Sequence, residues 1–86
     1  MREYGILFTR SARKELELLP APACERILSE IGSLSRRPFP SGCTKLRGER
    51  HLWRIRIGVY RVIYSVLTDR LVIEVIRIRH RKEAYR

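Results

Sequence analysis

The sequence predicts a single α+β domain over residues 1–86, in which an N-terminal strand and a two-helix hairpin pack on one face of a mainly antiparallel β-sheet. Apolar residues recur at helical spacing up to residue 34 and alternate as in strands from residue 44 onwards. A chain of 86 residues is also too short for a second hydrophobic core. The order strand, helix, helix and then a meander of strands places both helices against one sheet.

The first half of the chain predicts one strand and two helices. Residues 4–8 are apolar and end at a polar break, which indicates a strand. Thr9 or Ser11 can cap the helix that follows, and the prolines at positions 20 and 22 end this helix and begin the next. The second helix carries an apolar stripe at steps of three and four, made of Cys24, Ile27, Leu28, Ile31 and Leu34. The short linker predicts an antiparallel helix pair.

The second half predicts a loop followed by four strands. The loop, residues 35–43, holds two prolines and a glycine. The strands are predicted at residues 44–46, 52–57, 59–67 and 71–79, with turns near Gly58 and at residues 68–70.

Strand alternation predicts two different faces for this sheet. Trp53, Ile55 and Ile57 share one parity and are expected to face the helices, while Arg54 and Arg56 point the opposite way. Tyr60 and Tyr64 are assigned to the core by the same rule. Glu74 has the helix-side parity in the last strand, where an ion pair is expected. If the strands align, five arginines converge on the helix-free face, namely Arg54, Arg56, Arg61, Arg79 and Arg81.

The positive charge of the chain is concentrated in its second half. The net charge is +10, and residues 45–86 hold 12 Lys/Arg against 4 Asp/Glu. A field of one sign on one part of a protein indicates a polyanionic partner, most often nucleic acid, whereas a solubilising surface usually mixes both signs. No acidic residue lies close in sequence to the arginine cluster, so the helix-free face is predicted to be an un-neutralised polyanion site.

Other classes of protein are disfavoured by composition. The apolar runs are far shorter than the roughly 20 residues of a membrane-spanning helix, and the N-terminus resembles no signal peptide, so a cytoplasmic protein without membrane contact is expected. Cys24 and Cys43 form no CxxC pair and no cluster with histidine. We therefore expect inert thiols, no metal site and no cofactor.

Two segments carry a resemblance to a known family. "KLRGERHLWRIRIGVYRVIYSV" followed by "LVIEVIRIRHRKEAYR" resembles the RelE/ParE superfamily of bacterial and archaeal toxins. The resemblance implies a RelE-like microbial RNase toxin fold and a toxin of a toxin–antitoxin pair. It further implies a cognate acidic antitoxin, held in a hetero-oligomer at rest. For the RelE-type branch it implies the A site of the 70S ribosome, with its mRNA and rRNA, as the other partner.

RelE-type members cut mRNA without a metal ion. The ribose 2′-OH attacks the adjacent phosphate, which requires a base, cations around the phosphorane-like transition state and an acid for the leaving oxygen. By position, Arg54 and Arg56 match the first basic pair of RelE-type sites, Arg61 the hairpin arginine on the scissile phosphate, Arg81 the last-strand arginine and Tyr85 the C-terminal tyrosine. Arginine cannot serve as a base at neutral pH, so that role falls on Tyr85 or His80. The remaining residues predicted to bind RNA are Lys45, Arg47, Arg79, His80 and Lys82.

Two other functions stay open from the sequence. A ParE-type inhibitor of DNA gyrase would need no nuclease chemistry, and a non-toxic RNA-binding module would need only the charge. The arginine set together with Tyr85 favours the ribosome-dependent mRNA endonuclease, because a gyrase inhibitor has no evident need for it.

Overall fold

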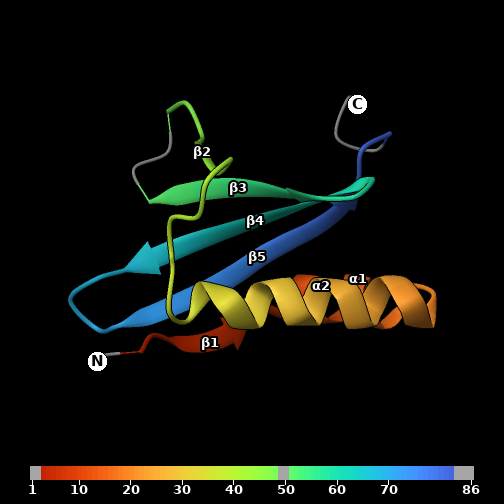
Figure 1. The fold of residues 1–86 in the computed structure, drawn as a ribbon, viewed down its shortest axis with the longest axis horizontal. Helices are drawn as coiled ribbons and strands as arrows, with labels where there is room; N and C mark the ends of the chain where they lie inside the picture. Colours follow the sequence, from red (N-terminus) through yellow and green to blue (C-terminus); the bar gives the residue numbers. More distant parts are fainter. Residues whose placement is uncertain (1–2, 49–50, 83–86) are drawn as a thin grey trace.

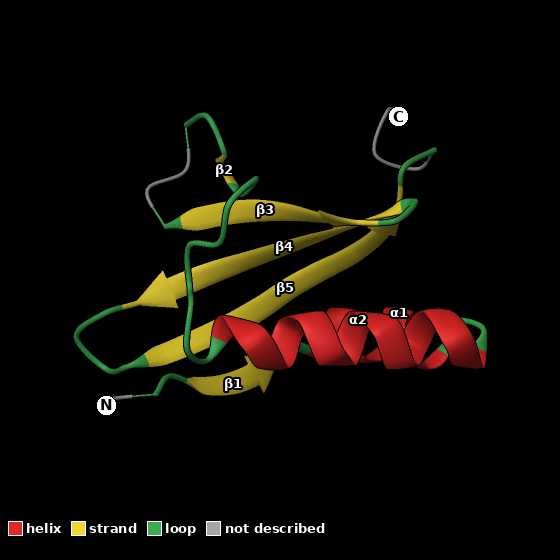
Figure 2. Cartoon of the chain, viewed as in Figure 1, coloured by secondary structure: helices red, strands yellow, loops and turns green. Residues whose placement is uncertain are grey.

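The computed structural model describes residues 3–48 and 51–82, which form two layers, one of helices and one of strands (Figures 1 and 2). In chain order its elements are β1 (Gly5–Phe8), α1 (Arg10–Glu17), α2 (Ala21–Leu34), β2 (Thr44–Lys45), β3 (Leu52–Ile57), β4 (Tyr60–Leu67) and β5 (Val72–His80). The strands form one sheet in the order β1-β5-β4-β3-β2, in which β1 is parallel to β5 and every other pair is antiparallel. The predicted fold class and order of elements are confirmed.

The helices begin and end where the capping residues and prolines predict. Thr9 is the N-cap of α1, and its Oγ1 accepts a hydrogen bond from the Ala12 N–H at 3.1 Å. Pro20 is the N-cap of α2, and Pro22 lies in its first turn, where a missing N–H costs nothing. No helix in the described ranges combines the length and the apolar composition that crossing a membrane requires.

The apolar stripe of α2 is narrower than predicted. Ile27, Ile31 and Leu34 are fully buried against the sheet, whereas Leu28 is 43% exposed. With 100° of rotation per residue, Leu28 lies at the margin of the stripe, on the side away from the other three. Its assignment to the core was wrong for this geometric reason.

The core lies between the helices and one face of the sheet. Its members from the strands are Ile55, Ile57, Val62, Tyr64, Val66, Ile73, Val75 and Ile78. The predicted parity is therefore confirmed for β3 and β4. Tyr64 is completely buried, and its hydroxyl donates a hydrogen bond to the Pro38 carbonyl at 2.8 Å, which ties the loop before β2 to the sheet. Burial, reinforced by Cys43, raises the pKa of the Tyr64 phenol well above its ordinary value.

The last strand, β5, contains a bulge that no local sequence pattern indicates. Ile63 of β4 pairs with Arg77, but the next residue, Tyr64, pairs with Val75, so Ile76 is an extra residue on β5. Parity along β5 changes at this bulge. Glu74 consequently lies opposite Ser65 on the helix-free face, and its predicted place on the helix side was wrong.

Candidate active site

Three arginines lie in a row across the helix-free face. Arg56 on β3 is directly opposite Arg61 on β4, and Arg61 is directly opposite Arg79 on β5. Side chains that face each other in an antiparallel pair have Cβ atoms only about 4.5–5.5 Å apart, and like charges in such pairs destabilise the sheet. The row places like charges opposite each other and so lowers the stability of the sheet. Such departures from local stability are typical of functional sites.

A hollow of about 130 Å³ lies beside the row, and three arginines line it. It is lined by Arg56, Gly58, Val59, Tyr60, Arg61 and Arg81. Arg61 is its buried member, with only 8% of its surface exposed, whereas Arg56 and Arg81 are exposed. Guanidinium groups match the oxygen atoms of a phosphate group in charge and geometry. The hollow is therefore chemically suited to a phosphate.

The tight turn between β3 and β4 brings these arginines together. Gly58 has a φ of 63°, a value that a hairpin turn of this kind requires and that glycine adopts at no cost. A Cβ at this position would lie 3.1 Å from Nη1 of Arg26, so the turn also packs closely against α2. The Arg81 N–H donates to the Val59 carbonyl at 2.7 Å, which fixes the chain after β5 to the same turn.

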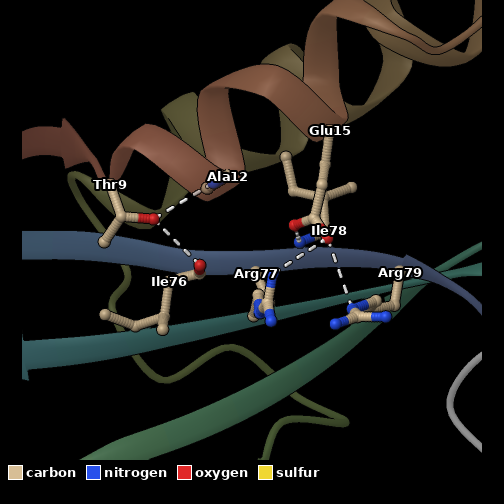
Figure 3. Close-up of polar contacts among 7 residues, drawn as sticks. All are labelled: Thr9, Ala12, Glu15, Ile76, Arg77, Ile78 and Arg79. Atoms are coloured by element: carbon tan, nitrogen blue, oxygen red, sulfur yellow. Dashed lines mark hydrogen bonds and ion pairs between the residues drawn. The ribbon is translucent and has the colours of Figure 1, made fainter.

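One acidic side chain reaches the arginine row from α1 (Figure 3). Oε2 of Glu15 lies 3.3 Å from Nε of Arg79 and 3.4 Å from Nη1 of Arg77. The prediction of a face without neutralising acids was therefore wrong for Arg79. Glu15 lies far from these arginines along the chain, so inspection of their sequence neighbours could not find it. Arg79 is also absent from the lining of the arginine hollow.

The other predicted cations of the described residues do not line the hollow. Arg54 shares the face of Arg56 but sits one row further, opposite Ile63, and does not line the hollow. Lys45 pairs with Trp53 and so projects from the opposite side of the sheet. Arg47 and Lys82 are exposed in the turns that follow β2 and β5. Tyr85 lies outside the described residues.

His80 is not brought together with the arginines of the hollow. Its ring packs edge-on against Tyr60 at a centroid distance of 5.5 Å. It lines a separate hollow of about 320 Å³ with Glu15 of α1 and residues 18–20, on the helix side of the sheet. Its Nδ1 accepts a hydrogen bond from the Lys82 N–H at 3.1 Å. Within the described part of the chain, no group of three His, Cys, Asp or Glu side chains is arranged to hold a metal ion.

The family model, the relative and the solved structures that this chain resembles are all toxins of toxin–antitoxin systems. A family model for the ParE toxin of the type II toxin–antitoxin system parDE matches residues 6–85. Toxin RelG of Mycobacterium tuberculosis is 32% identical over 88 residues, which cover 96% of this chain and 97% of RelG. Among solved structures, the archaeal RelE–RelB complex of Pyrococcus horikoshii matches with a TM-score of 0.82 and 32% identity, covering 92% of this chain and 96% of that one. The toxin–antitoxin complex RelBE2 of Mycobacterium tuberculosis matches with a TM-score of 0.81 and 29% identity, covering 91% and 98%.

Proposed function

We propose that this chain is a ribosome-dependent mRNA endonuclease. The chain belongs to the RelE/ParE superfamily of toxins and is a RelE-type toxin of a toxin–antitoxin system. The observation that supports this most is the hollow in which Arg56, Arg61 and Arg81 meet. Positive groups that are fixed in place before the reaction stabilise the charge that develops on a phosphate in the transition state.

The proposed reaction uses only the RNA and the protein. The 2′-oxygen of the ribose bonds to the adjacent phosphorus, and the bond from phosphorus to the 5′-oxygen of the next nucleotide breaks. A base takes the proton of the 2′-OH, and the leaving 5′-oxygen receives a proton. The products are a 2′,3′-cyclic phosphate and a 5′-hydroxyl, and we assign no metal ion to any step. Arg61 and Arg81 hold the phosphate, and Arg56 adds charge from the rim.

The base in this scheme is Tyr85. Arginine keeps its proton at neutral pH, so none of the three arginines can accept the proton of the 2′-OH. His80 is the other candidate, but it lies on the helix side of the sheet and its Nδ1 is engaged by Lys82. Tyr85 follows Arg81 by four positions in the sequence, and its phenol can both accept and donate a proton.

The exposed cations around the hollow are proposed to bind mRNA and rRNA in the A site of the 70S ribosome. Each contact with a phosphate adds affinity without reading the base sequence. Arg47 and Lys82 are in this group, and half-buried Arg54 joins them, whereas Arg79 is partly neutralised by Glu15. A site of action on ribosomes places the protein in the cytoplasm.

The resting partner is proposed to be a cognate acidic antitoxin, since relatives of similar fold have been solved as RelE–RelB and RelBE2 complexes. Acidic side chains of the antitoxin would neutralise the basic face, so the affinity should fall when salt rises from about 0.1 M to about 1 M and the Debye length shrinks from about 10 Å to about 3 Å. Calorimetric titration with the product of the neighbouring gene measures this. An affinity that does not change over that range would contradict an electrostatic contribution and indicate an apolar interface.

Inhibition of gyrase is the second candidate, because the matching family model describes a ParE toxin. Primer extension on cellular mRNA after a short induction separates the two. The endonuclease is expected to produce new 5′ ends within translated codons and to leave the untranslated regions intact. An absence of such ends, together with loss of DNA supercoiling by purified gyrase, would establish the ParE-type activity instead.

A further inference from the structure

Thr9 and α1 supply hydrogen-bond partners for the backbone of β5 beyond the point where its pairing with β1 ends. β1 pairs with β5 only as far as Val75. Beyond this point Thr9 continues the edge, since its N–H donates to the Val75 carbonyl at 3.0 Å and its Oγ1 donates to the Ile76 carbonyl at 2.9 Å (Figure 3). Glu15 follows one step further, with Oε1 accepting the Ile78 N–H at 2.9 Å. Thr9, the N-cap of α1, and Glu15 thus satisfy this edge up to the point where the arginine row begins.

Glu15 divides its two oxygen atoms between backbone and guanidinium groups. Oε1 holds the backbone of Ile78, while Oε2 faces Arg77 and Arg79. The Glu15 side chain is only 22% exposed, so water screens these contacts less than it would at an open surface. The carboxylate therefore both fixes the end of β5 and holds the Arg79 guanidinium toward α1.

The position of Arg79 matters because its closest cross-strand neighbour is the buried arginine of the hollow. Arg79 is directly opposite Arg61, which in turn is opposite Arg56. If the Arg79 guanidinium were released from Glu15, it could approach Arg61 and the bound phosphate, and would be a fourth arginine beside the three that line the hollow. The hollow would then lose the fixed arrangement on which stabilisation of a transition state depends.

We propose that Glu15 is a positioning residue, which holds Arg79 toward α1 and so keeps Arg61 in its place in the hollow. The inference rests on the proposed endonuclease function. It predicts a particular kinetic pattern for Glu15→Gln, because glutamine keeps an oxygen for the Ile78 N–H and removes only the charge. The single-turnover rate of mRNA cleavage should fall by about 10- to 100-fold, as misplacement of groups at a reacting centre does. The affinity for programmed ribosomes should not fall, because the released Arg79 adds a free cation to the basic face.

A double-mutant cycle with Arg79→Gln tests whether Glu15 acts through Arg79. In the Arg79→Gln background, the further change Glu15→Gln is expected to alter the rate by less than about twofold. Glu17→Gln is the matched control, since Glu17 is an exposed residue of the same helix, and it should cleave at the wild-type rate. An NMR spectrum of the Arg79 Nε–H group should show a shift in Glu15→Gln and none in Glu17→Gln.

The outcomes separate this inference from the proposed function. If folded Glu15→Gln cleaves mRNA at the same rate as the wild type, the positioning role is overturned and the endonuclease function stands. An equal loss of rate in both Arg79 backgrounds would also overturn it, because Glu15 would then act without Arg79. An absence of cleavage by the wild type would overturn the endonuclease function and the inference with it. If Glu15→Gln melts below the assay temperature, Glu15→Asp decides, since the shorter carboxylate withdraws from Arg79 and a wild-type rate would contradict the proposal.

Discussion

Replacement of Arg61 or Arg81 by glutamine is expected to lower the rate of mRNA cleavage on ribosomes by about 10²- to 10³-fold each, as loss of one fixed group that stabilises transition-state charge does. Arg61 has the stronger case because it is buried in the lining of the hollow and lies between two other arginines of the row. Arg81 lines the same hollow, and its N–H is bound to the Val59 carbonyl. Single-turnover cleavage with excess toxin measures the chemical step, and growth arrest on induction should be lost in parallel.

Both variants need a control for folding and for net charge. Arg70→Gln removes one positive charge from the turn at the other end of β4 and β5, where Arg70 is exposed and pairs with Asp69 at 4.0 Å. It is expected to cleave at the wild-type rate. Thermal melts show whether Arg61→Gln has lost stability, since its side chain is buried. A folded Arg61→Gln or Arg81→Gln protein with wild-type activity would show that the hollow is not the site of phosphate binding.

Tyr85→Phe is expected to lower the same rate by about 10²- to 10⁴-fold, the usual contribution of a positioned group that transfers a proton. The substitution keeps the aromatic ring and removes only the hydroxyl, so loss of activity would report on the proton and not on packing. Tyr85 lies outside the described residues, and its assignment depends on its place four residues after Arg81 and on the position of His80 on the other side of the sheet.

Tyr85→Ala distinguishes the remaining roles of this side chain. If Tyr85→Ala loses activity while Tyr85→Phe keeps it, the ring stacks or packs and the base must be found elsewhere. If both variants cleave like the wild type, Tyr85 has no part in the reaction. His80→Gln belongs in the same series, and we expect it to keep most of the cleavage rate.

Much of the fold could be predicted because its signals are local. The Thr9 cap, the prolines at 20 and 22 and the change from helical to alternating apolar spacing each act over a few residues. The alternation within residues 53–57 was enough to separate the core residues of β3 from Arg54 and Arg56. Alternation also predicted that Arg56 and Arg61 share one face, since β3 and β4 pair without irregularity across a short turn.

The features that escaped prediction depend on contacts between distant parts of the chain. The bulge at Ile76 follows from the pairing of β5 with β4 and from the hydrogen bond of its carbonyl to Thr9, neither of which leaves a local pattern. Glu74 was placed on the wrong face for that reason. Glu15 could not be connected with the arginines from the sequence, because its position in α1 says nothing about the end of β5. The arginine row was therefore predicted without the acid that partly neutralises it.

The central claim is that the ribose 2′-OH of mRNA attacks the phosphate held in the arginine hollow. The most direct test is single-turnover cleavage, on purified 70S ribosomes, of two mRNAs that differ only in a 2′-deoxy substitution at the scissile nucleotide. We predict cleavage of the unmodified mRNA with a 2′,3′-cyclic phosphate end, and no cleavage of the 2′-deoxy mRNA at that position. Equal cleavage of both mRNAs, or cleavage of neither by the active wild-type toxin, would contradict the proposed chemistry.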